Sequence, residues 1–488
     1  MAVRKAAAWM MAGQYATFVM QFATSVILSR LFLSPGDVGL FSIAFAAAML
    51  VSGFQDVGIT RFIVGQQAMR IDSVRLYAGV SVLIGWTIAV VLALLTPALA
   101  GLYHRAELAP ILTILAASCL VSPLALVPSG LLVRDMRFGS LFAVNFGSAV
   151  IGNGTALVLA AHGFGAASLA WSTLAGSAAR AALVLACRPV FPQFTRDWAL
   201  LRPLLGFSAH SLVINASGII GVRTPDMIVG RMLGPVPTGL FTRAGALAGQ
   251  MSTLVTSALT SVFASAFARK RDAGDPLSPS YLHLVACNTA INWPVMLALA
   301  LAAEPVVLLF YGPKWAGVAP LLRWTALGEA LFVAVPLHMD LPILLGRIRQ
   351  LIWVNWFDTA ITIAVLIAAC LYGVEAAAFG RIIYAALWVV IYAALLSRLL
   401  GFRAALLVPI YARSALCALA AGAPLALAPH WLGLAAADMG WLRLIGLGLA
   451  GVPCWTAMVV LTGHPLRGEA QGLRAHLTAA RAGAVGSA

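Results

Sequence analysis

The sequence is dominated by long apolar runs that follow one another with only short polar breaks. About fourteen runs approach or exceed the roughly 20 apolar residues that a transmembrane helix needs; they fall at residues 8–33, 38–64, 76–102, 109–132, 140–161, 164–187, 205–231, 236–264, 281–303, 317–343, 350–372, 375–398, 404–428 and 440–462. A transmembrane β-barrel would instead show short segments of alternating polarity. The pattern predicts an all-α polytopic membrane protein with about fourteen transmembrane helices.

The composition agrees with lipid as the natural environment of these runs. Hydrophobic residues make up 62% of the 488 residues and charged residues only 10%, whereas a soluble domain has about 25% charged residues. The net charge of +15 would suggest nucleic acid as the partner of a soluble protein. In a membrane protein it is typical of basic loops that face the cytoplasm, so we expect no nucleic-acid partner.

Most of the basic residues lie in every second connection between the predicted helices. Counting from the N-terminus, alternate connections hold Arg4, Lys5, Arg70, Arg75, Arg134, Arg137, Arg188, Arg196, Arg202, Arg269, Lys270, Arg271, Arg347, Arg349, Arg398, Arg403, Arg467, Arg474 and Arg481. The other connections hold little beyond Arg105 and Lys314. Positive charge marks the cytoplasmic side. The pattern predicts a multi-pass protein of a bacterial inner (plasma) membrane with both termini in the cytoplasm.

An internal repeat predicts the architecture. Residues 29–42, which begin Ser-Arg-Leu-Phe and end Gly-Leu-Phe-Ser, resemble residues 230–242, which begin Gly-Arg-Met-Leu and end Gly-Leu-Phe-Thr. Two shorter similarities keep the same order: 109–112 with 319–322, and 163–167 with 373–377. Each repeat contains six crossings, so both halves enter from the same face and a pseudo-two-fold axis should run along the membrane normal.

The repeat predicts five regions. They are an N-terminal six-helix lobe at 1–190, an interfacial linker at 191–204, a C-terminal six-helix lobe at 205–400, an added helix pair at 401–465 and a cytoplasmic tail at 466–488. Two lobes around a central site suit transport by alternating access. A duplication kept only for scaffold reasons is the alternative.

Several ionisable residues fall within the apolar runs, where each costs several kcal/mol unless it faces a cavity or a partner. Arg223 and Asp226 lie near the middle of one predicted helix and three residues apart, hence on one face. They could pair with each other, or contribute to a polar cavity. Glu329 lies near the middle of another run.

Arginine outnumbers the acids in this set, and a guanidinium group binds phosphate through two parallel hydrogen bonds. The candidate residues of a cationic substrate cavity are Arg30, Arg223, Arg231, Arg243 and Arg323. Arg30 and Arg231 lie near the outer ends of their helices, where a cation also suits the helix dipole. Other charges fall toward cytoplasmic ends, where they can extend to water or lie at the rim: Arg61, Arg180, Arg413, Asp340 and Asp358.

No sequence signature of catalysis or metal binding accompanies these charges. P-loop, HExxH and GxSxG motifs are absent, the eight histidines lack metal-ligand spacing, and the six cysteines occur singly. We therefore expect no catalytic residue, no metal site, no cofactor and no enzymatic activity.

At this point two motifs indicate a family. Residues 30–40, Arg-Leu-Phe-Leu-Ser-Pro-Gly-Asp-Val-Gly-Leu, followed by Asp-Val-Gly-Ile at 56–59, resemble the first hairpin of the Wzx-like polysaccharide flippases, lipopolysaccharide-exporter branch. Residues 134–138, Arg-Asp-Met-Arg-Phe, resemble the basic loop of that branch. The resemblance covers the first five helices, and the fourteen-helix plan extends it. Thr60-Arg61-Phe62 departs from the small apolar residues usual in this branch.

The resemblance implies a member of the MATE-related multidrug/oligosaccharidyl-lipid/polysaccharide exporter superfamily. Its substrate would be an undecaprenyl-pyrophosphate-linked oligosaccharide that passes from the cytoplasmic to the periplasmic leaflet for exopolysaccharide, capsule or O-antigen export. An ion gradient would drive the cycle, with Asp226 and Glu329 as coupling residues. Partners would be the lipid-linked oligosaccharide, membrane lipids, and the polymerase and glycosyltransferases of the same pathway.

Two other functions stay open. An ion-coupled MATE-type antiporter for drugs or cations has the same fold, although a cationic substrate prefers an acidic cavity. A membrane polysaccharide polymerase or ligase would need a substantial periplasmic loop for its chemistry, and the predicted outer loops are short.

Overall fold

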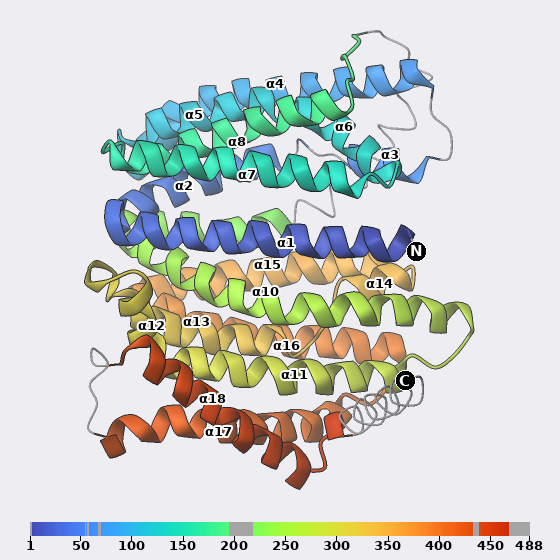
Figure 1. Cartoon of the computed structure of the whole chain (residues 1–488), viewed down its shortest axis with the longest axis vertical. Coiled ribbons are helices and arrows are strands. Elements are labelled where there is room, and N and C mark those ends of the chain that lie inside the picture. Colours follow the sequence, from blue (N-terminus) through green and yellow to red (C-terminus); the bar gives the residue numbers. More distant parts are fainter. Residues whose placement is uncertain are drawn as a thin grey trace, which may run out of the picture. The chain divides into compact units, whose positions relative to one another are not determined.

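The computed structural model describes residues 2–53, 55, 58–66, 70–194, 218–432 and 439–467, and every regular element in these ranges is helical (Figure 1). The predicted all-α class is therefore confirmed. The chain divides into two compact units, Met1–Thr242 and Arg243–Ala488. The predicted linker lies outside the described residues from residue 195 on, as do Asp56, Val57 and the tail beyond residue 467.

Within the described ranges, ten helices are long and apolar enough to cross a membrane. An eleventh span forms if the bent pair α5 (Leu108–Val121) and α6 (Pro123–Arg134) is counted as one, with a bend of 45°. Pro123 explains the bend because proline lacks an amide hydrogen and its ring clashes with the carbonyl four residues earlier. That carbonyl belongs to Cys119, and it accepts a hydrogen bond from Gln55 Nε2 at 3.2 Å instead.

The described part of the first unit contains, besides α5 and α6, six helices and a helical segment at 218–233. The helices are α1 (Ala2–Ile27), which continues into a π-helical turn at Leu28–Phe32, α2 (Pro35–Ser52), α3 (Ile59–Gly65), α4 (Ile71–Tyr103), α7 (Phe138–Ala161) and α8 (Ala166–Cys187). Helix α5 packs against α4 and α8, while α7 lies beside α8 and α1. Buried Leu92, Leu112 and Leu115 belong to the apolar core between these helices.

The turn before α2 contains residues that cap the start of the helix. Ser34 Oγ accepts a hydrogen bond from the Asp37 amide at 3.2 Å, and Asp37 Oδ2 accepts one from the Ser34 amide at 3.0 Å. This reciprocal capping box satisfies amide groups that have no partner inside the helix, and Pro35 occupies the first helical position. Helix α2 therefore begins at Pro35, directly after its capping residue Ser34.

The two copies of the sequence repeat meet at equivalent glycines. A Cβ atom added to Gly39 would lie 1.8 Å from the carbonyl oxygen of Pro235, and one added to Gly239 would lie 1.9 Å from the carbonyl oxygen of Pro35. Both contacts fall within the first unit, at the starts of α2 and α10 (Pro235–Asp272). Only glycine permits this reciprocal backbone approach, so the repeat has a structural counterpart at this crossing.

The second unit holds the rest of α10 and eight further helices. They are α11 (Ser278–Leu301), α12 (Ala303–Phe310), α13 (Val318–Phe332), α14 (Asp340–Leu344), α15 (Ile348–Cys370), α16 (Val374–Leu400), α17 (Leu407–Leu432) and α18 (Trp441–Leu461). Helix α16 packs between α13 and α15, and α11 packs on α13. The pair α17 and α18 joins the unit through contacts of α17 with α11 (Figure 1).

Candidate functional site

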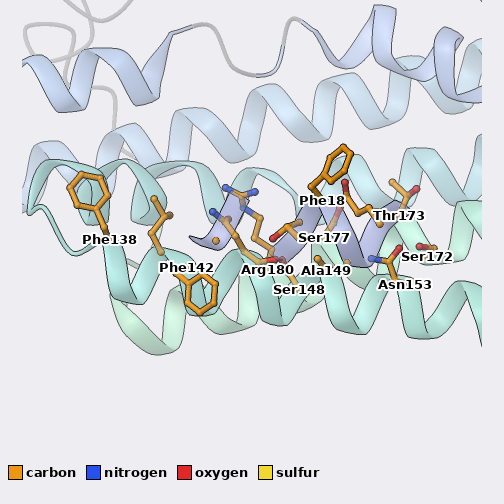
Figure 2. A pocket seen from close by; sticks show the side chains of 17 residues that line it. Phe18, Phe138, Phe142, Ser148, Ala149, Asn153, Ser172, Thr173, Ser177 and Arg180 are labelled. Atoms are coloured by element: carbon orange, nitrogen blue, oxygen red, sulfur yellow. Dashed lines mark hydrogen bonds between the residues drawn. The ribbon is translucent and has the colours of Figure 1, made fainter. Parts of the chain in front are cut away.

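Three helices of the first unit, α1, α7 and α8, line a pocket of about 760 Å³ (Figure 2). Most of its residues carry hydroxyl, amide or guanidinium groups although they lie on helices that are otherwise apolar. Because polar groups inside membrane helices are costly unless they face a partner or water, their concentration around one pocket makes it the candidate site.

Regular spacing on α1 and α8 turns the polar residues toward the pocket. Thr17 and Gln21 lie four residues apart on α1, and Thr173 and Ser177 lie four residues apart on α8. Residues four apart share one face of an α-helix. Each helix therefore presents a polar stripe to the pocket.

Helix α7 forms the wall between them through its own polar and small residues. Ser148 and Asn153 line the pocket, and Gly152 lies beside them. A Cβ atom added to Gly152 would lie 3.1 Å from the carbonyl oxygen of Ser172 and 3.4 Å from Gly176 Cα. Small residues let membrane helices pack backbone against backbone, and here they hold α7 and α8 as a single wall.

Arg180 is the one charged residue among those that line the pocket. Within the described parts of the chain, no carboxylate forms an ion pair with it. Its guanidinium group offers five donors in a planar fork that matches phosphate. Asn145 Oδ1, also at the pocket, is buried and has no hydrogen-bond partner among the described residues. The lining thus has both donors and acceptors available for a ligand.

Aromatic rings complete the lining. Phe18, Phe138 and Phe142 surround the polar groups in Figure 2. Hydroxyl and amide groups beside aromatic faces suit a sugar, which presents hydroxyl groups at its edge and apolar C–H groups on its faces. The same lining supplies one cationic group for an anion. Chemically, the pocket can bind a polyhydroxylated anionic molecule.

Three of the predicted cavity arginines belong to the first unit. The guanidinium carbon of Arg223 lies 5.2 Å from the centre of the Phe45 ring, a cation–π contact. Arg30 and Arg231 have exposed side chains. Asp226 accepts a hydrogen bond from Thr242 Oγ1 at 3.2 Å. None of these four residues lines the pocket.

The other predicted residues belong to the second unit. Arg243 lies over two rings, 5.4 Å from the centre of Tyr311 and 5.3 Å from that of Trp315. Arg323 is exposed. Glu329 Oε1 accepts a hydrogen bond from Arg381 Nη2 at 2.8 Å, and both side chains are mostly buried. The five arginines are therefore divided between the units, and their facing a common cavity stays a prediction.

A second cluster of polar side chains surrounds that ion pair on α13, α15 and α16. Tyr384 donates a hydrogen bond to Asp358 Oδ2 at 3.2 Å, and Tyr392 donates one to Asn355 Oδ1 at 2.5 Å. Asp358 Oδ1 is buried, and none of the residues that the structure describes forms a hydrogen bond with it. We refer to Glu329, Arg381, Asp358, Tyr384, Asn355 and Tyr392 as the second-unit cluster.

The sequence analysis considered Arg180 and Asp358 but did not predict the pocket or the second-unit cluster. Arg180 was expected to extend to water near the cytoplasmic end of its helix; its side chain is exposed, and it lines the pocket seven residues before the end of α8. Asp358 was expected toward the cytoplasmic side; it lies ten residues into α15, where it accepts a hydrogen bond from Tyr384. The available signal was the four-residue spacing of polar residues on α1 and α8, which an inspection of charges alone overlooks.

Comparison with known proteins identifies the family of this chain. A family model described as polysaccharide biosynthesis protein matches residues 27–320, more than half of the chain. The chain belongs to this polysaccharide biosynthesis family. The match begins at the last residue of α1 and includes α7 and α8, so the pocket falls within it except for its α1 residues, which lie between Gly13 and Gln21.

Curated relatives of this polysaccharide biosynthesis protein include two bacterial proteins. The succinoglycan biosynthesis transport protein ExoT of Rhizobium meliloti (strain 1021) is 26% identical over 341 residues, which cover 69% of this chain and 68% of the relative. The lipopolysaccharide biosynthesis protein WzxC of Escherichia coli (strain K12) is 25% identical over 310 residues, 61% of each chain.

Solved structures show the same fold at low sequence identity. The lipid II flippase MurJ in an inward closed conformation has a TM-score of 0.73 and 12% identity over 92% of this chain and 98% of that one. An inward-facing multidrug resistance MATE family transporter of the MOP superfamily has a TM-score of 0.58 and 18% identity over 78% and 95%. The family member therefore has a MurJ- and MATE-like all-α transporter fold.

Proposed function

We propose that this chain is a flippase that moves undecaprenyl-pyrophosphate-linked oligosaccharide repeat units between membrane leaflets for surface polysaccharide export. The observation that carries the proposal is the polar pocket with one arginine inside apolar helices of a polysaccharide biosynthesis family. Support comes from ExoT and WzxC, whose names assign them to succinoglycan transport and lipopolysaccharide biosynthesis. The fold supports translocation rather than catalysis as the activity.

The pocket residues suggest a division of roles toward this substrate. Ser148 and Thr173 donate their hydroxyl hydrogens to backbone carbonyls, so their oxygens would accept hydrogen bonds from sugar hydroxyls. The Asn153 amide would both donate and accept, and the phenylalanine rings would pack on sugar faces. Arg180 would bind a phosphate oxygen pair, for which its planar fork is shaped. The hydrocarbon tail needs no site within the chain because the surrounding lipid solvates it.

The predicted arginines extend the proposal to both units. Arg30, Arg223 and Arg231 from the first unit and Arg243 and Arg323 from the second would guide the pyrophosphate by charge. Arg223 and Arg243 already lie over aromatic rings, which hold a guanidinium in place without neutralising it.

Coupling to an ion gradient would use carboxylates. Asp226 and Glu329 are the predicted coupling residues, and the second-unit cluster adds Asp358. A carboxylate that is paired in one conformation and opened to water in another changes its proton or cation affinity between the two. Such a difference is what couples an ion to a conformational cycle.

Localisation follows from loop charge. The proposal places the protein in a bacterial inner membrane with both termini in the cytoplasm, since Arg347, Arg398 and Arg403 fall in the same set of loops as the N-terminal Arg4 and Lys5. A reporter fused at Asp275, between α10 and α11, should then report a cytoplasmic position. A periplasmic signal at this site would overturn the topology while leaving the fold intact.

A MATE-type drug antiporter is the second candidate, because the inward-facing MATE transporter shares the fold. The charge of the pocket argues against it, since a cationic drug would meet Arg180 and no lining carboxylate. Resistance to cationic drugs that is unchanged by deletion of the gene would agree with the flippase function.

The direct test is deletion of the gene in the producing bacterium, followed by complementation. Loss of the flippase should leave lipid-linked repeat units on the cytoplasmic leaflet and reduce surface polysaccharide, and the wild-type chain should restore both. Unchanged surface polysaccharide in a strain without a paralogue would overturn the proposal. Accumulation of single repeat units on the periplasmic leaflet would instead indicate a defect in polymerisation or ligation.

A further inference from the structure

The second unit contains a separate groove of about 730 Å³ at one end of two neighbouring helices. It is lined by the connection before α15, by the first turns of α15 and by the last turns of α16. The two helices run in opposite directions, so the start of one lies at the same membrane face as the end of the other. None of the groove residues belongs to the pocket of the first unit or to the second-unit cluster.

Two arginines give the groove its charge. Arg347 directly precedes α15 and Arg398 lies in the last turn of α16, and both line the groove. Both side chains are exposed. In the described ranges no carboxylate forms an ion pair with either of them, and no carboxylate lines the groove. Two guanidinium groups are thus open to an anion.

The remaining walls are apolar. Val354 and Ile391 continue the groove along the two helices, together with Leu395 and Leu399. Trp353, also a lining residue, has 69% of its surface exposed. Tryptophan is enriched at the level of lipid headgroups because its ring is amphipathic. The groove therefore has a cationic end at the membrane surface and an apolar course toward the membrane interior.

These properties match an amphipathic anion, in which a phosphate headgroup is joined to hydrocarbon chains. We propose that the groove binds an anionic membrane phospholipid of the phosphatidylglycerol class. Its phosphate lies between Arg347 and Arg398, Gln350 hydrogen-bonds the headgroup, and an acyl chain follows the apolar wall between α15 and α16. The same phosphate-plus-hydrocarbon chemistry occurs in a polyprenyl phosphate, but the groove offers no set of sugar-binding groups like that of the first unit.

The test uses the purified full-length protein in detergent and native mass spectrometry with added dioleoyl phosphatidylglycerol or dioleoyl phosphatidylcholine. We expect the wild type to prefer the anionic lipid. The variant Arg347→Gln/Arg398→Gln should lose roughly tenfold to thirtyfold of this preference, because each arginine at an anionic surface contributes about 1 kcal/mol. The variant Arg347→Lys/Arg398→Lys should keep much of it, which would show that charge rather than loss of folding is responsible.

A matched control is Arg349→Gln/Arg403→Gln. Arg349 lies in the first turn of α15 and Arg403 lies three residues beyond the end of α16; both are exposed, and neither lines the groove. The control should bind the anionic lipid like the wild type. An equal loss in the control, or full binding by the groove variant, would overturn the proposal in favour of a diffuse basic surface.

Competition separates the possible sources of the phosphate group. Inorganic phosphate should not displace phosphatidylglycerol, because it lacks the hydrocarbon that the apolar wall binds. Displacement of phosphatidylglycerol by inorganic phosphate alone would reduce the groove to a simple anion site and overturn the lipid assignment. Preferential displacement by undecaprenyl phosphate would overturn it as well, and would assign the groove to the transported lipid.

Discussion

The pocket of the first unit and the second-unit cluster are both polar, but they use their polar groups differently. In the pocket, and within the part of the chain that the structure describes, Arg180 has no ion-pair partner and Asn145 Oδ1 has no hydrogen-bond partner. In the cluster, Glu329 bonds Arg381, and Tyr384 and Tyr392 bond Asp358 and Asn355. Open groups are available for a ligand, while paired groups hold helices together and respond to protonation.

The largest effect is expected when the ion pair between Glu329 and Arg381 is broken. Glu329→Gln should lower the free energy of unfolding by about 3 kcal/mol, because removal of one partner leaves a mostly buried charge uncompensated. The double variant Glu329→Gln/Arg381→Gln should recover much of that loss. Denaturation of the single and double variants in detergent measures both values. Additive effects would mean that the two charges do not depend on each other.

The second test concerns the open charge. Arg180→Ala should leave stability nearly unchanged and weaken binding of a polyprenyl-pyrophosphate oligosaccharide by roughly tenfold to a hundredfold, the effect of about 1.5–3 kcal/mol for a hydrogen bond to a charged group. Arg180→Lys should recover part of the affinity.

Arg188→Ala is the control for this substitution. Arg188 lies just beyond the end of α8 and pairs at 3.7 Å with Asp135 at the surface, where such pairs contribute about 0–1 kcal/mol. Equal binding by wild type and the Arg180→Ala variant, measured by microscale thermophoresis, would remove Arg180 from the ligand site. Strong destabilisation by Arg180→Ala would mean that Arg180 stabilises the fold, as the charges of the second-unit cluster do.

The third test addresses the wall of the pocket rather than its polar groups. Gly152→Ala places a Cβ atom 3.1 Å from the Ser172 carbonyl oxygen, so α7 and α8 must separate at a cost of about 1–2 kcal/mol. Gly154→Ala, two residues along α7, meets nothing within 4 Å and serves as the control. Thermal denaturation should show a lower Tm only for the first variant. A similar Tm for both would mean that the wall tolerates a wider separation.

The smallest effect is expected from a neutral polar chain that joins α11 and α17 to the segment after α18. Thr289 and Ser414 lie within hydrogen-bond distance at 2.8 Å, and Ser414 Oγ lies 3.2 Å from His464 Nε2. Burial, with a smaller effect of the nearby Arg413 and His283, lowers the pKa of His464, which lies beyond the end of α18.

The unfolded chain then binds a proton more readily than the folded one. Stability should therefore decline as the pH falls through the ordinary histidine value of about 6.5. His464→Gln should weaken this decline, whereas His162→Gln, at the exposed end of α7, should not. Thermal denaturation between about pH 7.5 and about pH 5.5 measures the difference. An identical pH dependence in the wild type and the His464→Gln variant would contradict the lowered pKa.

Much of the fold was predictable because local sequence determines it. Continuous apolar runs need helices in lipid, where every backbone group must find its partner within the segment. The turn at Ser34–Asp37 carries its own capping residues within four positions. The repeat predicted that Gly39 and Gly239 are equivalent, and the structure brings them into reciprocal contact.

The candidate site was less predictable, because its chemistry depends on which helix faces are neighbours. The charge of Arg180 is visible in the sequence, but its pocket needs α1 and α7 beside α8. Glu329 stands out as a charge in an apolar run, but its partner lies 52 residues away on another helix. Asp358 shows the same dependence through its bond to Tyr384, 26 residues along the chain.

The sequence by itself determined the lipid environment of the apolar runs, the all-helical fold class and the repeated hairpin. These follow from hydrophobicity and from hydrogen bonds within a few residues, which need no knowledge of distant segments. The tertiary structure decided which polar groups stay open and which are paired. That difference arises only when helices pack, because the partner of a charged group inside a membrane protein usually comes from a neighbouring helix.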